Sequence, residues 1–382
     1  MRRAVESGRD VSQRRHCLLK AGGPPRLIMR TREIVPGGIM SGSVCFYVPS
    51  YIVDHIARNA RQLGLDADAA QRTAVASTAV RQQRRLLLAA TGLNAVTAPS
   101  PGNGDRHIFD DQHRFETGVQ AVRGEGDDPV AAGNVNAAYD ALGATREFFR
   151  EVLGRHSIDG AGSALLGDVN YGEKYGNAFW DGTRMVFGNG DGQVFQDFTR
   201  DIDVCAHELT HGVTQYTAGL VYTDQPGALN EAFSDIFGAC VEQYVQHVDA
   251  GEHNWLIGEQ VMADPMYGEA IRSMAHPGTA YDNPVLGKDP QAAHMSRYVP
   301  SGDPHINSGI VNRAFYLTAI ELGSFPAAKI FYAALQNLWP QAQFKDCAYI
   351  CAEQARLLAR DGKAGRHAPQ TVRAAFREVG VA

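Results

Sequence analysis

Seven residues, Cys-Ala-His-Glu-Leu-Thr-His at positions 205–211, constrain the fold and chemistry of this chain more than any other segment. On an α-helix, residues four apart lie on one face about one turn from each other, so His207 and His211 could bind one metal ion together. Glu208 follows the first histidine, so its side chain points to one side of the helix face that carries the two histidines. The motif alone does not decide between a metal site and a buried helix whose two histidines form hydrogen bonds.

A carboxylate follows at the start of the next predicted helix. The segment Asn230-Glu231-Ala-Phe-Ser-Asp235 comes after a turn that contains Pro226 and Gly227. Two histidine nitrogens and one carboxylate oxygen leave the fourth tetrahedral position for water, as in catalytic zinc sites. The glutamate between the histidines is then placed to take a proton from that water. The pattern therefore predicts a hydrolytic zinc centre.

The stretches that carry these residues resemble the thermolysin-like zinc metallopeptidases, a gluzincin family. The resemblance runs from about residue 107 to 382 and includes GNAFWDG, IDVCAHELTHGVTQYTAGLVY, GALNEAFSDIFG, IRSM and HINSGIVN in that order. It implies zinc ligands at His207, His211 and Glu231, with Glu208 as general base. The implied fold is α+β and two-lobed, with a strand-rich mixed N-terminal lobe, a mainly α-helical C-terminal lobe and the zinc site in the cleft between them.

The resemblance also implies groups that assist the zinc site. Tyr222 and His305 match the family's donors to the tetrahedral oxyanion, and Asp303 is a plausible partner for His305. Asp235 matches the acid that orients the first zinc histidine, and Asn230 matches the residue that supports the second. A packing role for the tyrosine, and a helix-capping role for the loop histidine, remain alternatives.

Substrate contacts follow from the same resemblance. Asn177 and Ala178 match edge-strand positions that bind the peptide main chain, and Arg272 matches the arginine that supports a substrate carbonyl. The pocket for the residue just after the scissile bond is matched by Phe195, Phe198, Val204 and Ile271. Such a pocket favours Leu, Ile, Phe or Val, because burying one of these side chains is worth roughly 1.5 to 3 kcal/mol. Each of the four could instead be plain core.

The family's paired calcium site is only partly matched. Its carboxylates correspond to Asp203, Glu242 and Glu259, but Asn254 and Leu256 replace two acidic ligands. With fewer oxygen ligands, the resemblance implies one calcium ion or none.

Four parts are expected along the chain. They are a disordered extension or start-site artefact at 1–39, a short helical propeptide and linker at 40–106, the N-terminal peptidase lobe with the HExxH helix at 107–225, and the helical C-terminal lobe at 226–382. In the last part, helices are expected at 227–246, 308–322, 326–337, 344–360 and 369–378, after the HExxH helix at 201–216.

The segment that begins Cys45-Phe-Tyr-Val-Pro-Ser-Tyr resembles the short propeptide of the protealysin-type branch. Apolar spacing predicts helices over 51–63 and 66–91, and the Pro-, Gly- and Asn-rich residues 94–106 are typical of a linker that a protease can cut. The expected propeptide covers the cleft in cis until that cut. An ordinary helical subdomain remains an alternative. Cys45 could approach zinc as a thiolate or be a buried free thiol.

Charge and hydropathy exclude other classes of function. The formal charge is -6, and because residues 1–39 carry nine basic and three acidic side chains, residues 40–382 carry -12. Such an acidic body argues against nucleic-acid binding. No apolar run reaches the roughly 20 residues of a membrane span. No secretory signal is visible, so either non-classical secretion or a cytoplasmic location is expected, and the chain is expected to be a monomer.

The favoured interpretation is a zinc-dependent neutral endopeptidase, made as a zymogen, that acts on peptides or proteins. The alternative from another class is a catalytically silent, metal-stabilised binding protein on the same fold. Glu208, Tyr222 and His305 are all present, which favours the enzyme.

Overall fold

The computed structural model describes residues 44–91 and 102–381, except for the side chains of 84–91. All of these residues belong to one compact unit, Ile39–Ala382. The expected extension and most of the expected linker lie outside the described residues.

A six-stranded mixed sheet carries the N-terminal half of the fold, with strand order β1-β5-β6-β4-β2-β3. Its strands are β1 (Cys45–Phe46), β2 (Arg106–Asp110), β3 (Gln120–Gly124), β4 (Leu165–Val169), β5 (Ala178–Trp180) and β6 (Met185–Phe187). β4 lies parallel to β2 and β6, whereas the β1–β5, β5–β6 and β2–β3 pairs are antiparallel. The first strand therefore comes from the predicted propeptide and extends the sheet beside β5.

Two helices follow β1, as the sequence predicts. Helix α1 (Ser50–Leu63) buries Ile52, Val53 and Ile56 and ends at Gly64, whose φ of 72° suits glycine. Helix α2 (Ala67–Thr91) begins after Asp66, whose Oδ1 accepts a hydrogen bond from the Ala69 amide at 3.0 Å.

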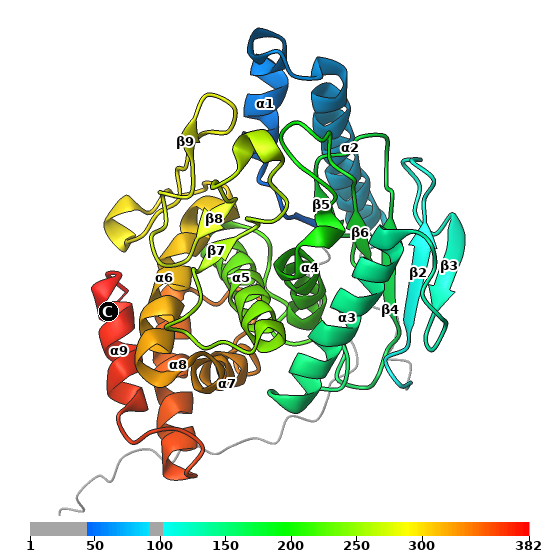
Figure 1. The fold of residues 1–382 in the computed structure, drawn as a ribbon. Helices are drawn as coiled ribbons and strands as arrows, with labels where there is room; N and C mark the ends of the chain where they lie inside the picture. The colour runs from blue at the N-terminus through cyan, green and yellow to red at the C-terminus, as the bar shows by residue number, and fades with distance from the viewer. Residues whose placement is uncertain (1–43, 92–101, 382) are drawn as a thin grey trace, which may run out of the picture. The chain divides into compact units, whose positions relative to one another are not determined.

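The remaining helices are α3 (Gly133–Glu151), α4 (Ile202–Gln215), α5 (Asp224–Gln246), α6 (Pro304–Leu322), α7 (Ser324–Leu335), α8 (Phe344–Arg360) and α9 (Ala368–Glu378). In Figure 1, helices α6 to α9 lie at the lower left, and α3, α4 and α5 lie between them and the strands β2 to β6. Short 3-10 helices lie at Phe198–Arg200, Asp264–Met266 and Met295–Arg297. Two further antiparallel pairs are formed by β7 (Leu256–Ile257) with β8 (Arg272–Ser273) and by β9 (Asp282–Asn283) with β10 (Gly287–Lys288). Helix α4, which carries the two histidines, packs between α3 and α5. The chain thus has a strand-rich N-terminal region and a helical C-terminal domain.

Two predicted helix starts were wrong by three or four residues. Helix α5 begins at Asp224 rather than 227, and α6 begins at Pro304 rather than 308. Pro226 and Pro304 lie in the first turns of these helices, where an amide hydrogen has no partner within the helix and proline is tolerated. Both prolines were predicted to lie before the helices, whereas they lie within the first helical turns.

Candidate active site

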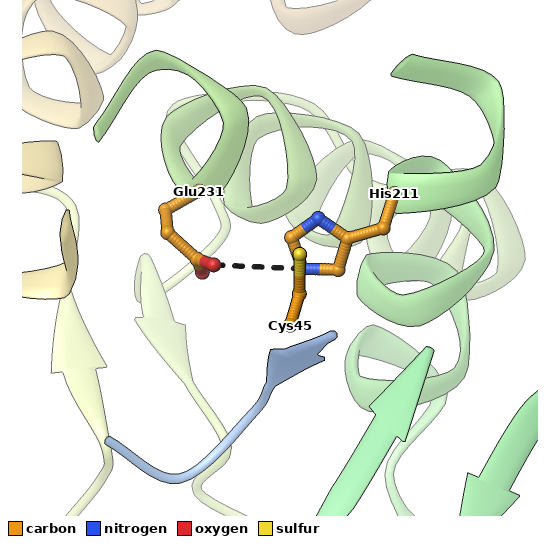
Figure 2. Close-up of side chains that lie close together, drawn as sticks. All are labelled: Cys45, His211 and Glu231. Atoms are coloured by element: carbon orange, nitrogen blue, oxygen red, sulfur yellow. Dashed lines mark ion pairs between the residues drawn. The ribbon is translucent and has the colours of Figure 1, made fainter. Parts of the chain in front are cut away.

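The predicted metal ligands converge from two helices. His207 and His211 project from α4, and their Nε2 atoms lie 3.0 Å apart. Glu231 projects from α5, with carboxylate oxygens 3.4 Å from His207 Nε2 and 3.7 Å from His211 Nε2. All three side chains are buried. Figure 2 shows Glu231 facing the His211 imidazole.

The outer nitrogens of both histidines are held by oxygen acceptors. His207 Nδ1 donates to Asp235 at 2.9 Å, and His211 Nδ1 donates to Asn230 Oδ1 at 2.9 Å. When both imidazoles are neutral, their Nε2 lone pairs point to one place beside the Glu231 carboxylate, which suits a cation bound between them. Two neutral imidazoles and one carboxylate are the donor set of a catalytic zinc site, so these residues fit zinc.

Glu208 lies beside this ligand set and is fully buried. Among the described residues, neither of its carboxylate oxygens has a hydrogen-bond partner. Burial raises the pKa of Glu208 to about 8. A buried carboxylate without partners next to a metal site is suited to accept a proton.

Two further side chains face the same point. The Tyr222 hydroxyl, from the loop before α5, donates to Glu231. His305, in the first turn of α6, has its Nε2 3.1 Å from a Glu231 oxygen and its Nδ1 2.7 Å from Asp303 Oδ1. Burial disfavours the charged imidazole, but the Glu231 and Asp303 carboxylates raise the pKa of His305 to about 10.

Asp235 joins the metal ligands to the predicted substrate contacts. Besides His207, its carboxylate accepts hydrogen bonds from Arg272 Nε and Nη2 and from Asn312 Nδ2, all between 2.8 and 3.1 Å. Burial opposes its ionisation, yet Arg272 and His207 lower the pKa of Asp235 to about 2. The arginine is thereby oriented so that Nη1, which does not bind Asp235, can donate to a carbonyl oxygen.

The predicted propeptide occupies the predicted substrate contacts with its main chain. The Tyr47 amide donates to Ala178 O at 3.0 Å. The Tyr47 carbonyl accepts from Arg272 Nη1 at 3.0 Å. The Val48 amide and carbonyl bond to Oδ1 and Nδ2 of Asn177 at 2.8 and 3.0 Å. Immediately upstream, the Phe46 carbonyl accepts from His305 Nε2 at 2.9 Å.

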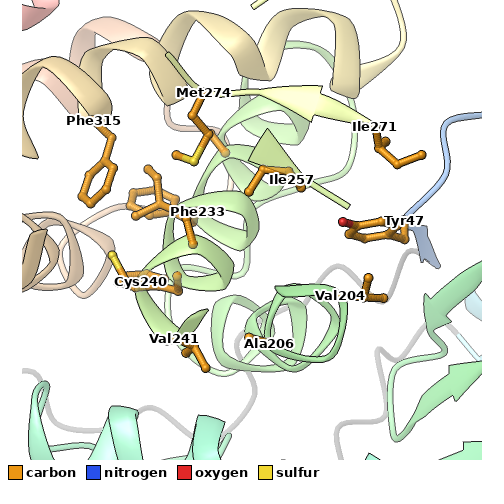
Figure 3. Packing of buried hydrophobic residues seen from close by; sticks show 14 of the residues in the cluster. Tyr47, Val204, Ala206, Phe233, Cys240, Val241, Ile257, Ile271, Met274 and Phe315 are labelled. Atoms are coloured by element: carbon orange, nitrogen blue, oxygen red, sulfur yellow. The ribbon is translucent and has the colours of Figure 1, made fainter. Parts of the chain in front are cut away.

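The ring of Tyr47 lies where the sequence places the side-chain pocket. It packs edge-on against Phe198, with ring centroids 6.4 Å apart, and belongs to the same buried cluster as Val204 and Ile271. Figure 3 shows Tyr47 beside Ile271 and Val204. Phe195 packs against Phe198 and also lines a small hollow with residues of α1 and α2.

The three carboxylates assigned to calcium accept hydrogen bonds from protein donors. Asp203 accepts from the Tyr47 hydroxyl at 2.8 Å and from the Gly258 amide at 2.8 Å. Glu242 lies 2.9 Å from His253 Nε2, and Glu259 accepts from Asn254 Nδ2 at 2.8 Å.

Sequence reasoning missed the residues that fill the site from the propeptide side. Tyr47 and Val48 had no assigned role, and Gly258 was not singled out. The available signal was the β-favouring run Val44 to Val48 just before Pro49, but a two-residue strand is too short for alternation to reveal.

The described helices contain no apolar stretch of the length that a bilayer requires. Cys45, Cys205, Cys240, Cys347 and Cys351 are buried and form no disulfide. The first of these lies at the metal ligands: its Sγ, a His211 nitrogen and a Glu231 oxygen lie within 4.8 Å of one another.

Comparisons with known proteins agree with this geometry. A model described as "Thermolysin metallopeptidase, catalytic domain" matches residues 97–215, and one described as "Thermolysin metallopeptidase, alpha-helical domain" matches residues 218–381. An extracellular metalloprotease of Pectobacterium carotovorum subsp. carotovorum is 42% identical over 302 residues, which is 77% of this chain and 85% of that protein. A thermolysin of Alicyclobacillus acidocaldarius subsp. acidocaldarius is 39% identical over 67% of this chain and 47% of its own length. The solved structure of the precursor of protealysin, a metalloproteinase from Serratia proteamaculans, matches with a TM-score of 0.76 and 38% identity over 88% of this chain and 100% of that chain.

Proposed function

The chain belongs to the thermolysin family of metallopeptidases, and from this we propose that it is a zinc-dependent endopeptidase made as a latent precursor. The observation that carries the proposal is the convergence of His207 Nε2, His211 Nε2 and the Glu231 carboxylate beside the unpaired carboxylate of Glu208.

Each side chain of the site has a role in peptide hydrolysis. Zinc held by His207, His211 and Glu231 would supply a Lewis acid that makes water acidic enough to lose a proton near neutral pH. Glu208 accepts that proton and can pass it to the departing amine, because its buried carboxylate lies beside the ligand set and has no hydrogen-bond partner among the described residues. His305 and Tyr222 donate to the carbonyl oxygen as negative charge develops on it.

The substrate is held as an added strand beside β5. Ala178 O and Asn177 Oδ1 accept hydrogen bonds from a peptide main chain, and Asn177 Nδ2 and Arg272 Nη1 donate to it. The propeptide already uses all four groups. We infer a preference for a bulky residue just after the scissile bond, because Phe198, Val204 and Ile271 form apolar walls.

Latency follows from the same contacts. A peptide that occupies these positions excludes a substrate, and its covalent tether makes rebinding intramolecular, so modest intrinsic affinity suffices. A cut in the 94–106 linker removes the tether. We further propose action outside the cell, supported by the name of the Pectobacterium relative, an extracellular metalloprotease.

Two earlier expectations receive less support. Tyr222 and His305 contact Glu231, and the unpaired Glu208 carboxylate lies beside the same ligand set, which argues against a silent binding protein. Calcium forms no part of the proposal, because Asn254 and Leu256 stand where the family has two of the acidic ligands.

The test compares the uncut chain with the chain trimmed in its linker by a small amount of added protease. We expect casein hydrolysis mainly after trimming, about one zinc per chain, and loss of hydrolysis with a chelator that added zinc restores. Equal hydrolysis by uncut and trimmed protein would make residues 40–93 a structural subdomain. A trimmed, zinc-loaded protein without activity would support the silent alternative.

A further inference from the structure

The propeptide lies in the site in the manner of a substrate, which raises the question of why it is not cut. The Phe46 carbonyl contacts His305, and the Tyr47 amide and carbonyl contact Ala178 and Arg272. These contacts set the Phe46–Tyr47 peptide bond in the place of a bond to be hydrolysed. A further feature must keep this bond intact.

Cys45 provides that feature, because its side chain reaches the metal ligands. The residue is 2% exposed and pairs with Trp180 in the β1–β5 ladder. Its Sγ, a His211 nitrogen and a Glu231 oxygen lie within 4.8 Å of one another. Figure 2 shows the sulfur lying over the His211 ring, across from the Glu231 carboxylate.

We propose that Cys45 is the fourth ligand of the same metal ion in the uncut chain, a proposal that rests on the proposed function. Thiolate sulfur binds zinc well, and sites with four protein ligands are closed, whereas catalytic sites keep one position open for water. The thiol loses its proton to solvent when the metal binds. With the fourth position filled, the chain contains the substrate contacts and the general base but no place for the attacking water.

The proposal explains how the uncut chain can stay inactive and intact although its propeptide lies in the site as a substrate would. Removing the propeptide takes the sulfur away together with the β1 strand, so one cut both opens the substrate contacts and frees the metal position. Steric occupation alone would leave the Phe46–Tyr47 bond exposed to the chemistry of the site.

The test uses cobalt as a spectroscopic substitute for zinc. The full-length Glu208→Gln chain, which should remain uncut, is loaded with Co²⁺ and its absorption recorded. We expect an intense near-ultraviolet thiolate-to-cobalt charge-transfer band. The band should disappear in the Cys45→Ser version at equal cobalt content, and it should also disappear after the linker is cut and the propeptide removed. The Cys240→Ser version, which alters a buried cysteine of α5, should retain it.

X-ray absorption of the zinc form gives a second readout, with a sulfur neighbour at about 2.3 Å expected in the uncut chain only. Stoichiometric cobalt without the charge-transfer band would overturn the proposal while leaving the peptidase assignment intact. Failure to bind any metal would instead contradict the proposed function.

A separate contact carries a second inference, about substrate choice. The Tyr47 hydroxyl donates to Asp203 Oδ1 at 2.8 Å, and the Gly258 amide donates to Asp203 Oδ2 at 2.8 Å. Tyr47 and Asp203 are 0% and 1% exposed. The hydroxyl end of the pocket is therefore polar, whereas the ring packs against Phe198 and His207 and lies under the Arg272 guanidinium.

Gly258 leaves the space that the hydroxyl needs. A Cβ at this position would lie 2.6 Å from the Tyr47 hydroxyl oxygen and 2.8 Å from Ile271 Cγ1. Since any larger residue would meet the phenol, the glycine and the carboxylate together shape the pocket for a hydroxylated aromatic ring.

We infer that Asp203 is a specificity-determining residue, and that the trimmed enzyme favours tyrosine over phenylalanine just after the scissile bond. Phenylalanine would fill the apolar part of the pocket but leave the buried Asp203 Oδ1 without this donor, and an unpaired buried polar atom costs more free energy than an unmade hydrogen bond at the surface. This inference rests on the proposed function.

Three matched peptides that differ only at this position, with tyrosine, phenylalanine or O-methyltyrosine, test the inference in the trimmed wild-type enzyme. We expect kcat/KM for tyrosine to exceed both others by about tenfold. Asp203→Asn and Asp203→Ala should reduce the tyrosine-to-phenylalanine ratio. A ratio near one in the wild type, with all three peptides cut, would refute the inference but not the peptidase assignment.

Discussion

Replacing Tyr47 by alanine should convert the latent chain into a leaky one without any cut. The side chain is fully buried in the closed state and becomes exposed when the propeptide leaves. Truncating a buried aromatic residue to alanine costs about 3 to 5 kcal/mol. Since that cost falls on the state in which the propeptide occupies the site, the fraction of uncut chains with an empty site should rise by roughly two to three and a half orders of magnitude, up to complete release.

The assay is the initial rate of hydrolysis of a short fluorogenic peptide, with mass spectrometry confirming that the chain is uncut during the measurement. Tyr47→Phe keeps the ring and loses only the hydrogen bond to Asp203, so it should raise the rate by about tenfold. Tyr349→Ala, at a residue 70% exposed on α8, is the control and should leave the rate unchanged.

Equal initial rates for uncut Tyr47→Ala and uncut wild type would refute this reasoning, provided that both chains hold equal zinc and both gain activity on trimming. The propeptide would then be held by contacts elsewhere, such as those of α1 and α2.

Three other predictions concern the chemistry and the stability of the chain. Glu208→Gln should retain near-wild-type zinc by metal analysis yet lose nearly all casein hydrolysis, because the amide cannot accept a proton while the ligands are untouched. His305→Ala should lower kcat far more than it raises KM for a short peptide, since its hydrogen bond strengthens as the carbonyl becomes anionic; a change in KM alone would reassign it to substrate binding. Burial and the nearby Asp168 carboxylate raise the pKa of Asp111 to about 8, above its unfolded value of 3.8, so the folded state holds a proton that the unfolded state has lost. Stability should therefore fall as pH rises from about 4 to about 8, and Asp111→Asn in the Glu208→Gln background should flatten that fall in thermal denaturation scans; parallel curves would contradict the assignment.

The helical part of the fold was readable from the sequence because its signals are local. Apolar spacing and end signals predicted the pro-segment helices and all the C-terminal helices, and the largest errors lie at the proline-containing starts of α5 and α6. The antiparallel β3 and the small strand pairs β7–β8 and β9–β10 were missed. Such short strands depend on partners distant in the chain, and their residues carry no period of their own.

In the candidate site too, local spacing in the sequence located some residues and could not locate others. His207, Glu208 and His211 could be located by spacing within one helix, and Glu231 by its place at the next. The roles of Tyr222, His305 and Arg272 came only through the family resemblance, because they lie on a loop, a helix start and a strand that are far apart in the chain. The partnership of Tyr47 with Asp203 joins residues 156 positions apart and leaves no trace in the sequence.

Loss of the propeptide turns β5 into the outer strand of the sheet, with an unpaired row of main-chain donors and acceptors. Exposed strand edges invite other chains to pair with them and can seed aggregation. In this protein the exposed edge would be only three residues long, Ala178–Trp180, and flanked by the Asn177 amide. So short an edge can hold a few residues of a passing peptide but offers little template for a growing sheet. In the proposed active form, the shortness of β5 would limit both aggregation through this edge and the length of substrate that the edge can hold.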